Sequence, residues 1–355
     1  MKKSFRLSLL MVVVLVLMSA VTFTKAQDAK VFRVAAVAPS AKNDLAFSQS
    51  MFDALTAIQK EMGADKFEFD FVEGTFNVDD AASALRDWAS SGKYNLLIAH
   101  GSQYGSVIQE LAPEFPEVSF AWGTDVNTFG LPNVYAYTAA AEQGGYINGA
   151  IAASLSKSGI MGVVGPIEVG DAKAYIDGFK AGAAATKSDI TVNVNYIQSF
   201  SDIPLATAAG KAFADNKADV LTGSAQMVVG PIGVAKEGKL LWFGTQANQS
   251  ELAGDAGVLF EVYHWEVILK DMITAIQAGT LGGEAYTIDL KNGGEVMETS
   301  PNYLATLSDD DKKAFQAKID DYVAKIGSGE IVVLPKVDAT PEATMEMTPE
   351  ATASG

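Results

Sequence analysis

Apolar and polar positions along the first part of the chain follow a strand-then-helix pattern. An apolar run extends from Val31 to Ala38 and meets Pro39. Proline cannot donate to a sheet ladder, so the run is predicted to be a buried strand that stops there. From Phe47 to Met62, apolar residues recur at steps of three and four, which predicts a helix with one apolar face. A strand leading through a short polar loop into a helix is typical of a doubly wound α/β sheet, whose ligands bind beyond the carboxyl ends of the strands.

Strand-like and helix-like segments alternate further along the chain and predict two blocks. The alternation restarts near residue 140, so two Rossmann-like α/β lobes of similar size with an interlobe cleft are predicted. After residue 258 the pattern predicts helices over 266–278 and 309–326 and strands over 286–290 and 331–334. The chain must then return from the second block to the first, and multiple crossings form a hinge that permits closure. The predicted first lobe is 31–139 plus about 255–282, and the second is 140–254 plus about 283–335.

The two ends of the chain are predicted to lie outside the folded lobes. The first 26 residues are predicted to be a secretory signal peptide, because two lysines are followed by an apolar run of about 15 residues and by small residues up to Ala26. The apolar run is shorter than the roughly 20 residues that a helix needs to span a bilayer. A retained membrane anchor is the alternative. Residues 336–355 are acidic, rich in Thr, Pro and Ala, and contain PEAT twice, which predicts a disordered tail. The protein is therefore expected to be extracytoplasmic or periplasmic.

Composition narrows the possible functions. The chain has no cysteine, which excludes disulfides and a lipoprotein cysteine, and its formal net charge of -17 argues against nucleic acid as a partner. It has only two histidines, His100 and His264, and neither lies in a nucleophile motif. It has no HExxH, no P-loop and no GxGxxG after the first strand, so neither a cofactor nor an enzymatic reaction is expected. An all-carboxylate metal site or hydrolase site stays open, because paired acids leave little local signature.

Six segments together resemble the basic membrane protein family, the extracytoplasmic substrate-binding proteins of ABC importers, to which purine nucleoside receptors belong. The resemblance covers residues 31 to 335 and implies the type I periplasmic-binding-protein fold, with two lobes joined by three crossovers. It implies no cofactor. It also implies that the protein is a monomer whose partners are an ABC permease and an ATPase. The segments, in the family's order, are NDLAFSQSMFDAL, PEVSFAWGTD, AAAEQGGYINGAIAA, GIMGVVG, YIDGFKAGA and SFSD.

The resemblance also implies roles for individual residues. Phe47 matches the aromatic residue that stacks on one face of a purine, and Phe200 is placed to supply the other face. Asn43 and Asp44 match a polar pair that hydrogen-bonds the base. Asp125 lies close to the acidic ribose contact. Aromatic faces and polar groups together suit a flat ring with donors and acceptors on its rim.

This chain departs from the family pattern at two positions. Gln246 stands where an aspartate usually contacts the ligand, and His264, beside Trp265, stands where a lysine often follows. These two replacements remove charge-assisted hydrogen bonds to the ligand. The ligand is therefore expected to be a purine nucleoside, a nucleobase or another small polar aromatic molecule. His100 follows a strand end and is a further candidate.

Several candidates have a structural alternative. Phe47 and Trp265 could belong to the core, and His100 could be held by backbone groups. Asp171 and Asp202 are expected to cap the helices that follow them. A ligand-sensing receptor for a membrane signalling protein would have the same fold and cleft, so this alternative to import also stays open.

Overall fold

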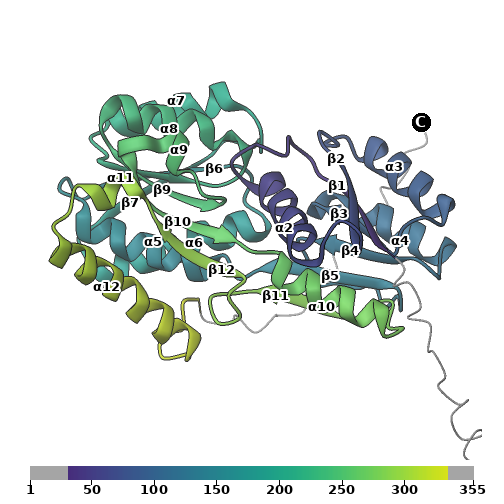
Figure 1. Ribbon diagram of the computed structural model, residues 1–355. Helices are drawn as coiled ribbons and strands as arrows, with labels where there is room; N and C mark the ends of the chain where they lie inside the picture. The colour runs from purple at the N-terminus through teal and green to yellow at the C-terminus, as the bar shows by residue number, and fades with distance from the viewer. Residues whose placement is uncertain (1–30, 335–355) are drawn as a thin grey trace, which may run out of the picture.

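The computed structural model describes residues 31–334 as two lobes, each built on a six-stranded sheet with helices on both sides (Figure 1). This confirms the predicted α/β architecture. The predicted signal peptide and the predicted acidic tail lie outside the described residues. No helix between residues 31 and 334 is both long and apolar enough to cross a membrane.

The first sheet has the strand order β11-β5-β4-β3-β1-β2, and all of its strands are parallel. Helices cover both of its faces, so its inner strands are mostly apolar and almost entirely buried. Its strands are β1 (Phe32–Val37), β2 (Phe67–Val72), β3 (Leu96–His100), β4 (Ser119–Gly123), β5 (Val134–Ala139) and β11 (Ala285–Ile288).

The second sheet has the order β12-β10-β9-β8-β6-β7 and is parallel except for its β12 edge, which pairs antiparallel with β10. Its strands are β6 (Ile160–Gly165), β7 (Thr191–Tyr196), β8 (Val220–Gly223), β9 (Leu241–Gln246), β10 (Gly257–Tyr263) and β12 (Glu295–Thr299).

Helices flank both sheets. With the first sheet lie α2 (Phe47–Met62), α3 (Val78–Ser91), α4 (Gly105–Glu114) and α10 (Glu266–Gln277). With the second sheet lie α5 (Glu142–Leu155), α6 (Gly170–Thr186), α7 (Ile203–Asp215), α8 (Val229–Gly238), α9 (Ser250–Ala253), α11 (Pro301–Ala305) and α12 (Asp309–Gly327).

Helices α5 and α6 pack more closely than their side chains would normally allow. A Cβ added at Gly149 would overlap the carbonyl oxygen of Phe179, and one added at Gly182 would overlap the carbonyl oxygen of Tyr146. The small residues of α5 therefore permit the close approach of two helix backbones.

The chain crosses between the lobes three times: after β5, between β10 and α10, and between β11 and β12. Strand pairing corrects the predicted division in two places. The sequence pattern puts residues 257–263 in the first lobe, but β10 pairs with β9 and β12 of the second sheet. It puts residues 285–288 in the second lobe, but β11 pairs with β5 of the first.

The strand predicted at 331–334 does not form, and these residues are bends without regular secondary structure. The place beside β10 is taken by β12, which pairs antiparallel with it. Strand β10 already has β9 on its other side, so no partner is left there for a C-terminal strand.

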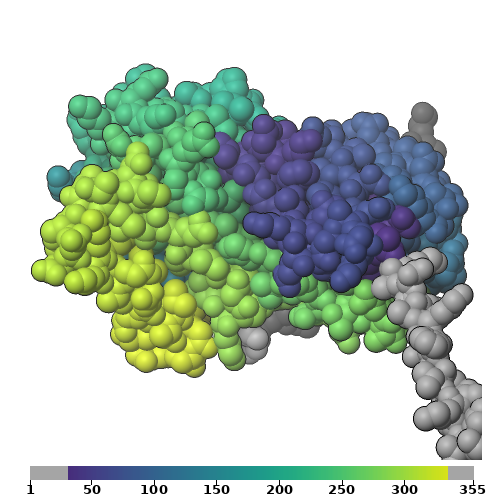
Figure 2. All heavy atoms as spheres, in the orientation of Figure 1, coloured from purple at the N-terminus to yellow at the C-terminus, as the bar shows by residue number. Residues whose placement is uncertain are grey.

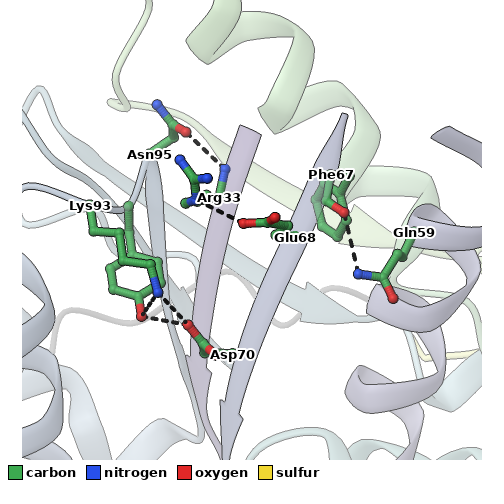
Figure 3. Close-up of polar contacts among 8 residues, drawn as sticks. Arg33, Gln59, Phe67, Glu68, Asp70, Lys93 and Asn95 are labelled. Atoms are coloured by element: carbon green, nitrogen blue, oxygen red, sulfur yellow. Dashed lines mark hydrogen bonds and ion pairs between the residues drawn. The ribbon is translucent and has the colours of Figure 1, made fainter. Parts of the chain in front are cut away.

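A polar network covers the first sheet where β1 and β2 begin, at the end opposite the strand carboxyl termini (Figure 3). Arg33 Nε lies 2.8 Å from Glu68 Oε2, and Lys93 Nζ lies 3.3 Å from Asp70 Oδ2, which also accepts a hydrogen bond from the Tyr94 hydroxyl. The charges pair with one another on an exposed edge. Charged side chains of this kind protect an edge strand from pairing with another chain.

Candidate ligand-binding cleft

A cleft lies between the two lobes at the carboxyl ends of their strands. Its empty volume is about 490 Å³ including its mouth, within the range of roughly 300–1,000 Å³ typical of small-molecule sites. The first lobe contributes Pro39, Phe47, Phe76, Gly101, Ser102, Gln103 and Thr124, and the second contributes Val169, Gly170, Asp171, Ala172, Phe200, Ala225, Gln226 and Gln246.

The two lobes touch each other across this cleft. Gln249 Nε2 of the second lobe donates to the carbonyl oxygen of Leu45 in the first at 3.0 Å. Thr124 Oγ1 lies 3.5 Å from Asp171 Oδ1. In the space-filling view, the purple α2 region of the first lobe lies directly against the green second lobe (Figure 2). The arrangement is therefore a closed one, with the lobes in contact beyond the three crossovers.

Phe47 begins α2 and lines the cleft, as predicted for the stacking residue. The His100 ring stacks on it, with ring centroids 3.8 Å apart and planes 8° apart. His100 Nε2 donates to the carbonyl oxygen of Phe47 at 3.0 Å, which leaves Nδ1 to accept from the Tyr137 hydroxyl at 2.8 Å. Burial lowers the pKa of His100 to about 3, so the ring is neutral at physiological pH.

His100 and Trp265 thus lie behind Phe47 and do not line the cleft. Trp265 Nε1 donates to Ser50 Oγ of α2 at 2.9 Å, and its ring meets Phe47 edge-on with centroids 6.5 Å apart. Both residues are predicted ligand contacts with a structural alternative. The structure supports the alternative, because both are fully buried supports of the Phe47 ring.

Phe200 follows β7 and lines the cleft from the second lobe. Phe76, half exposed in the loop after β2, lies opposite it with ring centroids 6.4 Å apart. Sequence reasoning missed Phe76. A lone large aromatic residue in the polar loop that follows a strand end was the available signal.

Three other predicted contacts lie outside the cleft wall. Asn43 is exposed. The Asp44 carboxylate accepts from the backbone N–H groups of Ala46, Ser48 and Gln49, so it caps the start of α2. Asp125 Oδ1 accepts from the backbone N–H groups of the next two residues and holds a turn. For Asp44 and Asp125, local backbone donors satisfy oxygens that the sequence predicts to meet the ligand.

Gln246 and His264 differ in their positions. Gln246 ends β9 and lines the cleft, and its Oε1 accepts from the backbone N–H of Ala225 at 3.2 Å. His264 lines a second cavity instead, and its Nδ1 lies 2.7 Å from Glu266 Oε1. That hydrogen bond raises the pKa of His264. Gln246 lies between the two cavities because both include it.

Asp171, predicted only as a helix cap, lines the cleft near the start of α6. Its Oδ2 is buried and has no hydrogen-bond partner among the described residues. Burial raises its pKa to about 6, with hydrogen bonding lowering it part of the way. Asp202, by contrast, does cap α7, since its carboxylate accepts from the backbone N–H of Leu205 at 2.9 Å. The two acids have similar positions in the sequence, and only the folded structure distinguishes their roles.

A family model described as ABC transporter substrate-binding protein PnrA-like matches residues 31–327. A purine-binding protein of Brucella abortus is 28% identical over 267 residues, covering 75% of this chain and 73% of the relative. The ABC transporter nucleoside-binding protein BmpA of Lactococcus lactis is 27% identical over 279 residues, covering 71% and 77%. A solute-binding protein of an ABC transporter system from Conexibacter woesei has the same fold, with a TM-score of 0.69, 24% identity and coverage of 86% of this chain and 98% of that one. The chain belongs to the PnrA-like family of ABC transporter substrate-binding proteins.

Proposed function

We propose that this protein is the extracytoplasmic receptor of an ABC importer and binds a purine base or nucleoside between Phe47 and Phe200. The observation that carries the proposal is the position of these two aromatic residues on opposite lobes of one cleft. Stacking on an aromatic face contributes about 1–3 kcal/mol per base. The purine-binding and nucleoside-binding relatives support the same ligand class.

Closure follows from the same geometry. The ligand docks on one lobe, where its ring meets Phe47, and the second lobe then brings Phe200 and Gln246 over it. A ligand favours the closed form only through contacts that it gains on closure. The permease then distinguishes the closed, loaded protein from the open one. The receptor acts as a monomer, since one chain supplies both walls of the cleft.

The free base fits this cleft better than the nucleoside does. Asp125, the residue expected to contact a ribose, lies outside the cleft wall, and its Oδ1 holds a turn. Gln246 Oε1 is occupied by a backbone N–H. Neither residue therefore offers a carboxylate in the cleft wall to the hydroxyls of a sugar.

A thermal-shift screen tests the proposal. Adenine, guanine, hypoxanthine and their nucleosides are compared with sugars and amino acids at matched concentrations. Selective stabilisation by purines that grows with ligand concentration is expected, with about 2.7 kcal/mol at a hundredfold excess over Kd. Stabilisation by sugars or amino acids alone would contradict the proposed ligand class.

A further inference from the structure

The polar side chains of the cleft wall come from both lobes, but its one charged side chain is on the second lobe and it includes no base. Of the lining residues, none is a lysine, arginine or histidine, and Asp171 is the one acid. Lys173, on the same helix, is held by ion pairs with Glu168 and Asp177. Asp171 therefore has no cation to pair with in the wall of the cleft.

Two acceptor atoms in this wall lack a hydrogen-bond donor among residues 31–334. One is Asp171 Oδ2, and the other is Gln226 Oε1, both buried. The hydroxyl of Thr124, from the other lobe, lies 3.5 Å from the second Asp171 oxygen, Oδ1. A buried polar group without a partner is costly, and a buried carboxylate more so. Both residues line the cleft, so a ligand that places a donor beside these atoms would remove the cost.

Further acids lie behind Asp171. Glu142 on α5, Glu261 on β10 and Glu295 on β12 are all buried in part or fully, and the Asp171 charge helps to raise the pKa of the two strand residues. The cleft wall and the residues behind it thus hold acids, and the wall holds no base. An anionic ligand would meet repulsion with no base to offset it.

Resting on the proposed function, we propose that Asp171 determines base specificity by accepting hydrogen bonds from a ring N–H and an adjacent N–H of an uncharged purine. A lactam N–H beside an amino group, as in guanine, presents two parallel donors to one carboxylate, which is a charge-assisted and bidentate arrangement. Adenine presents its amino group beside a ring nitrogen that is itself an acceptor, so one oxygen of Asp171 would face a lone pair. Nucleotides are rejected because of their phosphate charge.

The test is calorimetric titration of guanine, 1-methylguanine, adenine and guanosine monophosphate into the wild-type protein and two variants. Asp171→Asn removes the charge while keeping the shape. Asp202→Asn is the matched control, because it makes the same change on the same lobe at a residue that only caps α7, and asparagine also caps helices. Thermal unfolding of each variant shows that it is folded.

We expect the wild type to bind guanine at least about tenfold more tightly than 1-methylguanine or adenine, and the nucleotide not measurably. Asp171→Asn should lower guanine affinity by at least about tenfold and remove most of the preference over 1-methylguanine, while Asp202→Asn keeps both. A purely steric effect of the methyl group would persist in Asp171→Asn, because asparagine has the same size.

The outcomes separate the two proposals. If purines bind but the wild type does not prefer guanine over 1-methylguanine, or if Asp171→Asn keeps that preference, the role of Asp171 is wrong and the receptor function stands. If no purine binds the wild type, the proposed function fails and the role of Asp171 fails with it. The wild-type comparison of guanine with 1-methylguanine needs no variant, so it decides the question even if Asp171→Asn does not fold.

Discussion

Phe47 and His100 form a face-to-face pair with ring centroids 3.8 Å apart, and His100 also donates to the Phe47 carbonyl oxygen at 3.0 Å. One residue thus fixes both the ring and the backbone of the other. One face of the Phe47 ring is covered by His100, and the residue still lines the cleft. Trp265 lies edge-on to both rings, so the three residues form one aromatic cluster in the first lobe beside the cleft.

Replacing His100 with alanine should weaken base binding as well as stability. The stacking partner of Phe47 is lost, and aromatic pairs contribute about 0.5–1.5 kcal/mol beyond the area that they bury. His100→Phe keeps a ring behind Phe47 and loses only the hydrogen bonds, so it should retain more affinity than His100→Ala. Calorimetric titration of both variants measures the difference. Equal affinities for the two variants would show that the stack does not position Phe47.

Two buried acids should make stability fall as pH rises above the ordinary pKa range of a glutamate. Burial, together with repulsion by neighbouring acids, raises the pKa of Glu261 and of Glu295 well above the usual range. Neither carboxylate oxygen of Glu295 has a hydrogen-bond partner among the described residues. A pKa raised by folding gives stability that is complete below the unfolded pKa and is lost as pH rises through the folded one. Each tenfold difference in proton affinity between the folded and unfolded chains corresponds to about 1.4 kcal/mol of stability.

Glu295→Gln should therefore be more stable than the wild type at pH 9 and should differ less from it at pH 5. Denaturant unfolding from pH 5 to pH 9 measures the effect, and the two histidines are present in both proteins, so the difference between the two profiles reports Glu295. The exposed change Glu251→Gln is the matched control and should leave the pH profile unchanged. Parallel profiles for the wild type and Glu295→Gln would contradict the burial of this acid.

Gly149→Ala should destabilise the second lobe. Its new methyl group would overlap the Phe179 carbonyl oxygen on α6, and overpacking of this kind costs about 1–3 kcal/mol. Gly233→Ala in α8 is the control, because a Cβ there meets nothing within 4 Å. Helix propensity predicts that this control is neutral or stabilises by up to about 1 kcal/mol. Chemical denaturation compares the two, and equal stabilities would contradict the close contact of α5 with α6.

Local pattern predicted the elements that begin each lobe, and with them part of the site. The apolar stripe from Phe47 to Met62 and the position of Phe200 after a predicted strand both follow from residues close in sequence. Pattern could not predict which sheet a late strand joins. Strands β10 and β11 are short apolar runs, and their membership depends on pairing with β9 and β5, far away in the chain.

Polar site residues were harder to predict than aromatic ones. Asp44, Asp171 and Asp202 each lie at or just before the start of a helix, where an acid usually caps. Two of them do cap, whereas Asp171 keeps a buried oxygen without a partner in the cleft. The difference comes from the first lobe, whose Thr124 lies close to Asp171 across the cleft. Residue spacing near Asp171 in the sequence could not predict this contact.

The central claim is that a flat ring is held between aromatic residues from two lobes that close on each other. Calorimetric titration of guanine or hypoxanthine into the wild type, Phe47→Ala and Phe200→Ala tests it most directly. The account predicts that each substitution weakens binding by about 1–3 kcal/mol while the protein stays folded in a thermal scan. Unchanged affinity in both folded variants would contradict it.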